Sequence, residues 1–435
     1  MMAVSSGPLT FGQLSLWRSV QHLPRERRHE GNLATVWTLP DGSSADAVTE
    51  AWHELQARHP SLHTIYRLSD PQEPQQVLHP HASRVDISTV QTAAGGRDAE
   101  EEARRVVAAL ATEPFDLTSQ YSFRVRVLER RGRATHVAMV HHHLGADGMG
   151  KAILWDDLTA MLAGREPRTP AYSLIGLAEE QRSATGAARH RAAVRHWEKI
   201  FTASAARNAP LAGAEAGAET ETLQVCLRSR RSRAAAAVLA NRWELSVPTL
   251  ALTAYVAAVA DVQKVRSLPM WLLSANRFTP RWERCVSTVN QWTPTHVEAT
   301  PEAGFAELAR LLHRRGLQAY RHGMYNPDAM AEVRGRFPDR AAKVEHLWAV
   351  NHIIDPFSAD SVVADGRAEA ALTWEPVFQA LGPRFYLRIT DNGRDSWALR
   401  LRARGLARDD LACMVRRVHE VLIAEAQRAE PADAA

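Results

Sequence analysis

The sequence predicts an α/β protein of two lobes, and three observations support this. The chain has 435 residues, whereas single hydrophobic cores stop growing at roughly 250–300 residues, so two lobes are expected. Segments with the period-two pattern of strands alternate with segments that repeat apolar residues every three or four positions, as amphipathic helices do. Neither half has a glycine-rich phosphate loop, which argues against a nucleotide-binding domain.

The first half of the chain predicts two paired strands followed by a helix. Tyr121–Leu128 alternates apolar residues with arginines, and a turn at Gly132 leads back into Thr135–His143, which is apolar on both sides and therefore predicts an interior strand. Gly148–Leu162 has helical periodicity, and Gly164 can end that helix. The other elements expected here are a helix at Leu9–Ser19, a strand at Leu33–Leu39 and a helix through Val48, Trp52 and Leu55.

The second half predicts a further set of helices and strands. Ser246 and Pro248 are the cap and first-turn residues of an expected helix, and Asp391–Gly393 is a hairpin turn signal. The expected helices are Ala234–Arg242, Val247–Val262 and Leu411–Ala426, and the expected strands are Met270–Ser274, Leu347–Asn351, Phe385–Thr390 and Trp397–Ala403. We expect an N-terminal lobe at 1–175, a C-terminal lobe at 176–435, and an exposed, linker-like stretch of Ala, Gly and Glu near 202–222.

Composition excludes several classes of function. Lys and Arg exceed Asp and Glu by 53 − 49 = 4, too small an excess for a nucleic-acid-binding protein of this length. The three cysteines, Cys226, Cys285 and Cys413, have neither disulfide-framework nor zinc spacing. The first residues lack a secretory core, and the longest apolar run, Leu250–Ala260, is too short to span a bilayer. We therefore expect a cytoplasmic protein without a membrane segment.

Three consecutive histidines end the interior strand. Side chains alternate along a strand, so His141 and His143 share one side and His142 points to the other. If the chain turns after His143, that ring can project into a cleft while Asp147 folds back beneath it. Gly148 would then permit a backbone conformation or a close approach that a side chain would forbid. His143, Asp147 and Gly148 are therefore the candidate catalytic residues.

This arrangement suits acyl transfer, although other interpretations stay open. A neutral imidazole can accept a proton from an attacking amine or hydroxyl, and such help is worth about 10²- to 10⁴-fold in rate. A histidine on a strand can equally be an ordinary core or surface residue. Metal binding by His143 with Asp147 is disfavoured because no second pair of ligands accompanies them, so no metal is expected.

The chain resembles the condensation domains of nonribosomal peptide synthetases, which have the chloramphenicol-acetyltransferase-like fold. The run His142–Gly148 (HHLGADG) fits the HHxxxDG signature of that family in full. Leu9–Trp17 and Arg58–Tyr66 are similar to its first two motifs, with Ser15 and His63 where arginines are usual. Further similar segments are Pro114–Leu117, the arginine-bearing strand at Arg124–Val127, Tyr172–Ala178, Ser274–Arg277 and Val289–Asn290.

The resemblance implies roles for particular residues. His143 is the catalytic histidine and His142 supports it, while Asp147 holds the site through a salt bridge with Arg277 across the two lobes. Asn290 and Trp292 are expected at the substrate tunnel. Gln291-Trp292 stands where threonine and leucine are usual, so the bulky Trp292 either reshapes the tunnel or packs in the core.

The resemblance also implies an architecture and a reaction. Two chloramphenicol-acetyltransferase-like lobes, each a mixed sheet flanked by helices, form a V-shaped pseudo-dimer. The protein is then a free-standing, monomeric condensation enzyme that joins an acyl or aminoacyl thioester to an amine or alcohol acceptor in natural-product biosynthesis. Carrier proteins (peptidyl or acyl) deliver substrates in trans on phosphopantetheine arms, and this chain binds no cofactor of its own.

Relatives with other activities leave alternatives open. The heterocyclising branch has aspartates at both histidine positions and is disfavoured by His142 and His143. Epimerising relatives carry serine and tryptophan directly after the aspartate, which this chain lacks. An acyl-CoA-dependent acyltransferase remains an alternative. So does a catalytically silent recruitment module, although its histidine motif is usually disrupted.

Overall fold

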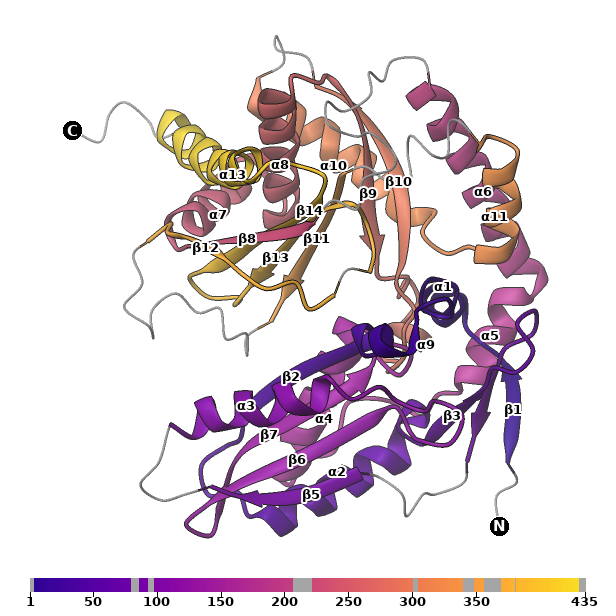
Figure 1. Ribbon diagram of the computed structural model, residues 1–435. Helices are drawn as coiled ribbons and strands as arrows, with labels where there is room; N and C mark the ends of the chain where they lie inside the picture. Colours follow the sequence, from indigo (N-terminus) through magenta and orange to yellow (C-terminus); the bar gives the residue numbers. More distant parts are fainter. Residues whose placement is uncertain are drawn as a thin grey trace. The chain divides into compact units, whose positions relative to one another are not determined.

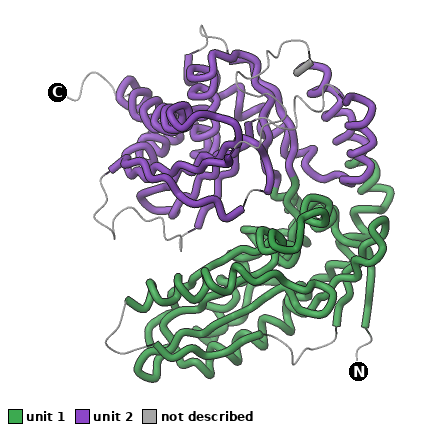
Figure 2. Tube along the Cα trace, in the orientation of Figure 1, with its two compact units in different colours: residues 1–190, 275–291 green, residues 191–274, 292–435 purple. Residues whose placement is uncertain are grey.

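The computed structural model describes residues 4–79, 86–92, 98–205, 221–299, 304–338, 348–355, 369–379 and 381–429 (Figure 1). Figure 2 shows the division of the chain into two compact units. Unit 1 consists of Met1–His190 and Ala275–Gln291, and unit 2 of Arg191–Ser274 and Trp292–Ala435. The chain therefore leaves unit 1 after His190 and comes back to it for residues 275–291, which we call the return segment.

This division differs from the boundary expected after residue 175. Helix α5 (Leu174–Arg182) packs on strand β1 (Ser5–Pro8), where Gly7 lies against Ile175, so the helix belongs to unit 1. The expected linker-like stretch near 202–222 lies for the most part, at residues 206–220, outside the described residues. The end of the helix before it and the strand after it both belong to unit 2, so this stretch does not join the two units.

The main sheet of unit 1 places the histidine strand in its interior. The strand order is β2-β7-β6-β5, and only the β5–β6 pair is parallel. The strands are β2 (Asn32–Thr38), β5 (Asp86–Gln91), β6 (Phe123–Arg130) and β7 (Arg133–His142). The β6–β7 turn uses positive φ at Arg131 and Gly132, as expected for a tight hairpin. Strand β7 is thus hydrogen-bonded on both sides.

Helices cover both faces of this sheet (Figure 1). Helix α3 (Ala99–Ala111) packs on β2, β6 and β7, and its apolar residues share one cluster with Ala138 and Val140. Helix α2 (Ala45–Arg58) packs on β6 and β7 and against α4 (Gly148–Leu162). Because side chains alternate along β7, His142 lies on the α3 side and His141 on the other.

Shorter elements complete unit 1. A second sheet has the order β1-β4-β3 and is antiparallel throughout. The remaining elements are α1 (Phe11–Val20), η1 (Arg25–Gly31), η2 (Pro60–His63), β3 (Thr64–Arg67), β4 (Gln75–Leu78) and, in the return segment, α9 (Pro280–Glu283). Thr10 caps α1 through a reciprocal capping box with Gln13.

Unit 2 is built on one mixed sheet of seven strands in the order β10-β9-β11-β13-β14-β8-β12. The strands are β8 (Thr222–Ser229), β9 (Ser267–Ser274), β10 (Gln291–Glu298), β11 (Trp348–Ile354), β12 (Leu372–Trp374), β13 (Phe385–Asp391) and β14 (Trp397–Arg404). Strand β11 is parallel to both neighbours, and the β13–β14 hairpin turns at Gly393 as its sequence predicts.

Two apolar clusters pack on opposite faces of this sheet. Neighbouring residues of β9, whose side chains point to opposite faces, belong to different clusters. Met270 and Leu272 join the cluster of α7, α8, α10 and α13, whereas Trp271 joins that of α6 and α11. The helices are α6 (Ala184–Ala205), α7 (Arg231–Trp243), α8 (Val247–Gln263), α10 (Phe305–Arg321), α11 (Pro327–Gly335) and α13 (Arg408–Ala429).

The predicted fold class is confirmed, since each unit has a mixed sheet flanked by helices. All elements named from the sequence are present, but α3, α5, α6, α10, α11, the strands β8 and β10 and several shorter strands were not expected. Within the described part of the chain, no single helix is long and apolar enough to cross a membrane. Helices α7 and α8 are long and apolar enough only when taken together, and the pair is bent by 112°.

Candidate active site

His143 follows the last residue of β7 and differs from its two neighbours in exposure. His141 and His142 are buried, whereas residue 143 is partly exposed. The backbone N–H of His143 donates to the carbonyl of Gly31 at 2.7 Å, which extends the strand pairing by one residue. The His142 ring packs so closely on Gly31 that a Cβ there would lie 2.4 Å from Nε2. Glycine at position 31 therefore lets the strand end in this conformation.

Thr288 of the return segment binds both the side chain and the backbone of His143. The threonine hydroxyl donates to the His143 carbonyl oxygen, and His143 Nδ1 lies 3.1 Å from Thr288 Oγ1. The hydroxyl hydrogen of Thr288 points to the carbonyl oxygen, so Oγ1 accepts a hydrogen bond from His143 Nδ1. Nδ1 therefore carries the hydrogen of the neutral ring. In the neutral ring, Nε2 is then bare and able to accept a proton.

His142 has the opposite tautomer. The backbone N–H of Leu144 donates to His142 Nδ1 at 3.2 Å, so the hydrogen of the neutral ring is on Nε2. Burial lowers the pKa of His142 to about 3, and nearby His143 adds to the effect. Burial likewise lowers the pKa of His141 to about 3. Burial also lowers the pKa of His143, although Asp147 and backbone hydrogen bonds oppose this. All three rings are therefore neutral near pH 7.

Asp147 is the N-cap of α4 and forms a buried ion pair with Arg277. Its carboxylate receives two hydrogen bonds from the guanidinium, each 2.8 Å long, and the two side chains are 1% and 2% exposed. Oδ1 also accepts from the backbone N–H of Gly150, and Oδ2 from that of Val289. Burial alone would raise the pKa of Asp147, but the charge of Arg277 and these hydrogen bonds lower it. Asp147 is thus a permanent anion.

The structure brings Asp147 and Arg277 together, but not across two lobes as the resemblance implies. Arg277 lies in the return segment and therefore in the same unit as Asp147. Its guanidinium also donates to the carbonyls of Cys285 and Ser287, at 3.1 and 3.2 Å, within the return segment itself. The ion pair thus fixes the return segment to the start of α4, inside unit 1.

The expectation that a side chain at Gly148 would be forbidden is wrong. Gly145 is the glycine that lies too close to its neighbours for a side chain. Gly148 has no positive φ, is exposed, and a Cβ at this position would meet nothing within 4 Å. At Gly145 a Cβ would lie 2.3 Å from Ser122 Oγ and 2.8 Å from the Phe123 ring. Both glycines follow the histidines, and the sequence does not tell which one lies against its neighbours.

The two expected tunnel residues lie in different surroundings. Asn290 is partly exposed and belongs to unit 1. Trp292 belongs to unit 2, where it packs against the Trp197–Trp271 cluster and meets Tyr386 edge-on at 5.6 Å. Its carbonyl accepts a hydrogen bond from the hydroxyl of Tyr325 at 2.8 Å. These contacts are those of a core residue.

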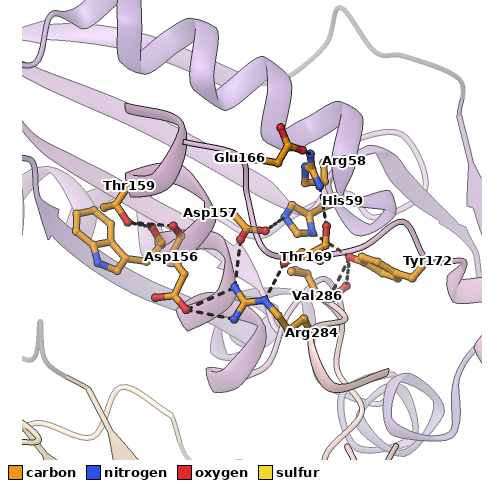
Figure 3. A network of polar contacts seen from close by, with 11 residues as sticks. Arg58, His59, Asp156, Asp157, Thr159, Glu166, Thr169, Tyr172, Arg284 and Val286 are labelled. Atoms are coloured by element: carbon orange, nitrogen blue, oxygen red, sulfur yellow. Dashed lines mark hydrogen bonds and ion pairs between the residues drawn. The ribbon is translucent and has the colours of Figure 1, made fainter. Parts of the chain in front are cut away.

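Sequence reasoning did not find a second polar network next to this site (Figure 3). Asp157 of α4 contacts His59 and Arg284, and Tyr172 contacts His59 and Val286. His59 and Tyr172 lie in segments that resemble family motifs, but no pattern in the sequence links these residues to one another or to Asp157 and Arg284. Across the described ranges, no group of three or more His, Cys, Asp or Glu side chains is placed to hold a metal ion.

The condensation-domain family model matches residues 7–333, so the chain belongs to the condensation domain family. Nonribosomal peptide synthetase kk1B of Curvularia clavata is 29% identical over 164 residues, which cover 36% of this chain and 1% of that protein. Phosphinothricin tripeptide synthetase PhsC of Streptomyces viridochromogenes is 30% identical over 168 residues, 38% of this chain and 15% of that protein. The chain thus matches only a small part of these synthetases.

The fold is shared with solved condensation domains. The structure described as the molecular basis for condensation domain-mediated chain release from the enacyloxin polyketide synthase has a TM-score of 0.76 and 19% identity. The alignment covers 98% of this chain and 84% of that one. The resemblance drawn from the sequence and the chloramphenicol-acetyltransferase-like fold that it implied are thus confirmed.

The two glycines offer a matched test of which position needs the absence of a side chain. Gly145→Ala should destabilise the protein by about 1–3 kcal/mol, because the new methyl group forces Ser122 or the Phe123 ring to move. Gly148→Ala should be neutral or raise stability by up to about 1 kcal/mol, because it reduces the freedom of the unfolded chain. Urea denaturation of both variants measures this, and equal costs would contradict the assignment.

Removal of one partner of the buried ion pair should be costly. Asp147→Ala should lower the free energy of unfolding by about 3–5 kcal/mol, because Arg277 is left charged and buried. The double variant Asp147→Ala with Arg277→Met should regain much of this loss, since no unpaired charge remains. Chemical denaturation gives both values; an Asp147→Ala variant as stable as wild type would contradict the pairing.

Proposed function

We propose that this chain joins an acyl or aminoacyl thioester, carried by a separate carrier protein, to an amine or hydroxyl acceptor. The observation that supports this best is the state of His143: the residue is partly exposed, and its imidazole is neutral and held with Nε2 bare. A general base must be unprotonated and able to reach the proton that it removes. Family membership supplies the reaction class, namely condensation in natural-product biosynthesis.

The proposed reaction needs only His143 to carry the proton from the acceptor to the leaving thiolate. The acceptor nitrogen or oxygen attacks the thioester carbonyl, and Nε2 takes the proton that the acceptor loses. The tetrahedral intermediate then expels the thiolate as the carbon–sulfur bond breaks, and the imidazolium returns the proton to sulfur. The net products are an amide or ester and a free phosphopantetheine thiol. Positioning of the two substrates supplies the rest of the rate enhancement.

Asp147 supports this chemistry without taking part in proton transfer. Both of its oxygens already accept hydrogen bonds from Arg277 and from the backbone, and its pKa is lowered. The carboxylate also favours the imidazolium of His143 that forms during the reaction, since it raises the pKa of that ring. We assign Asp147 and Arg277 to positioning, and His142 to structural support of the strand end.

We propose that Gly148 keeps space open for substrate rather than permitting a special backbone. It is exposed at the first position of α4, and apart from its own helix and chain neighbours no described residue lies within 4 Å of where its Cβ would be. Asn290 is a candidate substrate contact because its side chain is partly exposed and follows Val289, whose N–H binds Asp147. Trp292 has core contacts, which favour a structural role.

Carrier proteins are the proposed partners because the curated relatives are peptide synthetases. The phosphopantetheine arm belongs to the substrate in this proposal, so the chain itself supplies only amino-acid side chains. An acyl-CoA donor presents the same arm and thioester, and we therefore include it in the test. We expect the active species to be a monomer in the cytoplasm.

A direct test is product formation by His143→Ala. Wild-type protein is incubated with acyl-loaded carrier proteins or acyl-CoA and a panel of amines and alcohols, and products are identified by mass spectrometry. We expect His143→Ala to lose at least about 10²-fold in rate while still binding carrier. His53→Ala, which changes an exposed histidine of α2, is the matched control. Full activity of His143→Ala would refute catalysis by this residue and favour a recruitment role.

The pH dependence of kcat/KM should follow the ionisation of His143. Because burial lowers its pKa below the ordinary 6.5, the ring is neutral and active above that value, and activity falls only at more acidic pH. We therefore expect a plateau near neutral pH and an acid limb with its midpoint below 6.5. A midpoint above 6.5 would contradict a base whose pKa is lowered by partial burial.

A further inference from the structure

The return segment reaches His143 through Thr288, and two aspartates of α4 hold that segment. Asp147, at the N-cap of the helix, binds Arg277 and the N–H of Val289. Asp157, ten residues further along the same helix, binds Arg284 at 3.1 Å. Thr288 lies between these attachment points in the sequence. Its position therefore depends on both of them.

Asp157 has a buried carboxylate that is bound by both Arg284 and His59 (Figure 3). Its side chain is 1% exposed, with Oδ1 bound by Arg284 and Oδ2 by His59 Nε2 at 3.1 Å. Arg284 also donates from Nε to the hydroxyl of Thr169 at 3.1 Å. Burial alone would raise the pKa of Asp157, but hydrogen bonds from His59 and Thr169 lower it, so the group is an anion.

A chain of hydrogen bonds runs from Asp157 to the backbone N–H of Val286, two residues before Thr288. A carboxylate only accepts, so His59 Nε2 carries a hydrogen. Burial lowers the pKa of His59, so the ring is neutral and its Nδ1 is bare. Nδ1 therefore accepts from the Tyr172 hydroxyl at 3.1 Å, and the Tyr172 oxygen accepts from the N–H of Val286 at 3.0 Å. The Val286 carbonyl oxygen lies 3.4 Å from the same hydroxyl as a second, longer acceptor contact.

We propose that Tyr172 is a positioning residue for His143, which it orients through the backbone of Val286 and the side chain of Thr288. The inference rests on the proposed function, since it assigns a role in the same reaction. Tyr172, itself bound to His59, accepts a hydrogen bond from the N–H of Val286. Thr288 follows two residues later and holds the His143 ring with its hydrogen on Nδ1.

This network acts on the base and not on the substrate. His59 and Asp157 are fully buried, and none of the contacts of His59, Asp157 or Tyr172 is to His143. If the link through Val286 is cut, Thr288 can shift away from His143, and the ring is free to flip or to change its tautomer. A shift of this kind lowers the rate of chemistry while substrate binding is retained.

Tyr172→Phe tests the link by removal of one hydroxyl. The N–H of Val286 then loses its partner, and we expect kcat to fall about ten- to a hundredfold with KM changed less than about twofold. The matched control is Tyr255→Phe, because Tyr255 is also buried and its hydroxyl has no hydrogen-bond partner among the described residues. That variant should keep wild-type kcat.

A spectroscopic readout separates positioning from a general loss of structure. The ¹⁵N spectrum of imidazole-labelled protein, assigned with His143→Gln, reports which ring nitrogen of His143 carries the hydrogen. In wild type we expect the hydrogen on Nδ1, and in Tyr172→Phe a mixture of tautomers. Thr288→Val should give the same mixture and the same loss of kcat, whereas Thr288→Ser keeps the hydroxyl and should restore the wild-type tautomer and most of the activity.

The outcomes distinguish this inference from the proposed function. If His143→Ala is inactive while Tyr172→Phe and Thr288→Val keep wild-type kcat and the Nδ1 hydrogen, His143 is the base but the positioning role is refuted. If His143→Ala is fully active, the proposed function fails, and the tautomer measurement still decides whether Tyr172 orients the ring. Should Tyr172→Phe not fold, Thr288→Val and Thr288→Ser test the last link to His143: because the role of Tyr172 acts through Thr288, wild-type kcat and an Nδ1 hydrogen in Thr288→Val would refute it.

Discussion

The buried ion pair of Asp147 and Arg277 is the interaction on which the rest of the site depends. Two charges that are almost fully buried each cost several kcal/mol of desolvation, which their attraction offsets only with good geometry and further hydrogen bonds. The carboxylate here binds the guanidinium and two backbone N–H groups, and the guanidinium also binds two backbone carbonyls. The pair is therefore more than a link between two side chains, because it fixes the first turn of α4 and the fold of the return segment at once. The return segment carries Thr288, which lies beside His143.

Helix α4 acts as a rigid support in this arrangement. It begins at the residue after the N-cap Asp147 and also carries Asp157, so the spacing between the two attachments of the return segment is set by helix geometry. Side chains held by a helix and by buried partners keep one geometry more closely than side chains on an unsupported loop. The return segment itself has only the short helix α9. Its order therefore comes from what it binds, which includes an arginine–aspartate pair at each of two points on α4 and an apolar cluster formed with Leu177.

How much of this could be predicted from the sequence depends on whether the signal is local. The β7 strand, the bounds of α4 and the histidine at the strand end follow from alternation, periodicity and capping within about thirty residues. The Asp147–Arg277 pair was found only through the family resemblance, which also placed it across two lobes instead of inside unit 1. Thr288 lies 145 residues from His143, and no pattern links them. The glycine error has a similar cause, since contact with Ser122 and Phe123 is a property of packing and not of spacing.

The same reasoning explains why two adjacent histidines are not interchangeable in this site. Both rings are neutral near pH 7, so charge does not distinguish them. The two rings differ in which nitrogen carries the hydrogen. The Leu144 N–H places the hydrogen of His142 on Nε2, whereas Thr288 places the hydrogen of His143 on Nδ1. The Nε2 of His142 also lies against Gly31 in the interior, where no substrate can reach it. The side of the strand and the hydrogen-bond partner of each ring thus decide which histidine can act as the base. A proton acceptor at this strand end therefore requires the return segment as well as the histidine.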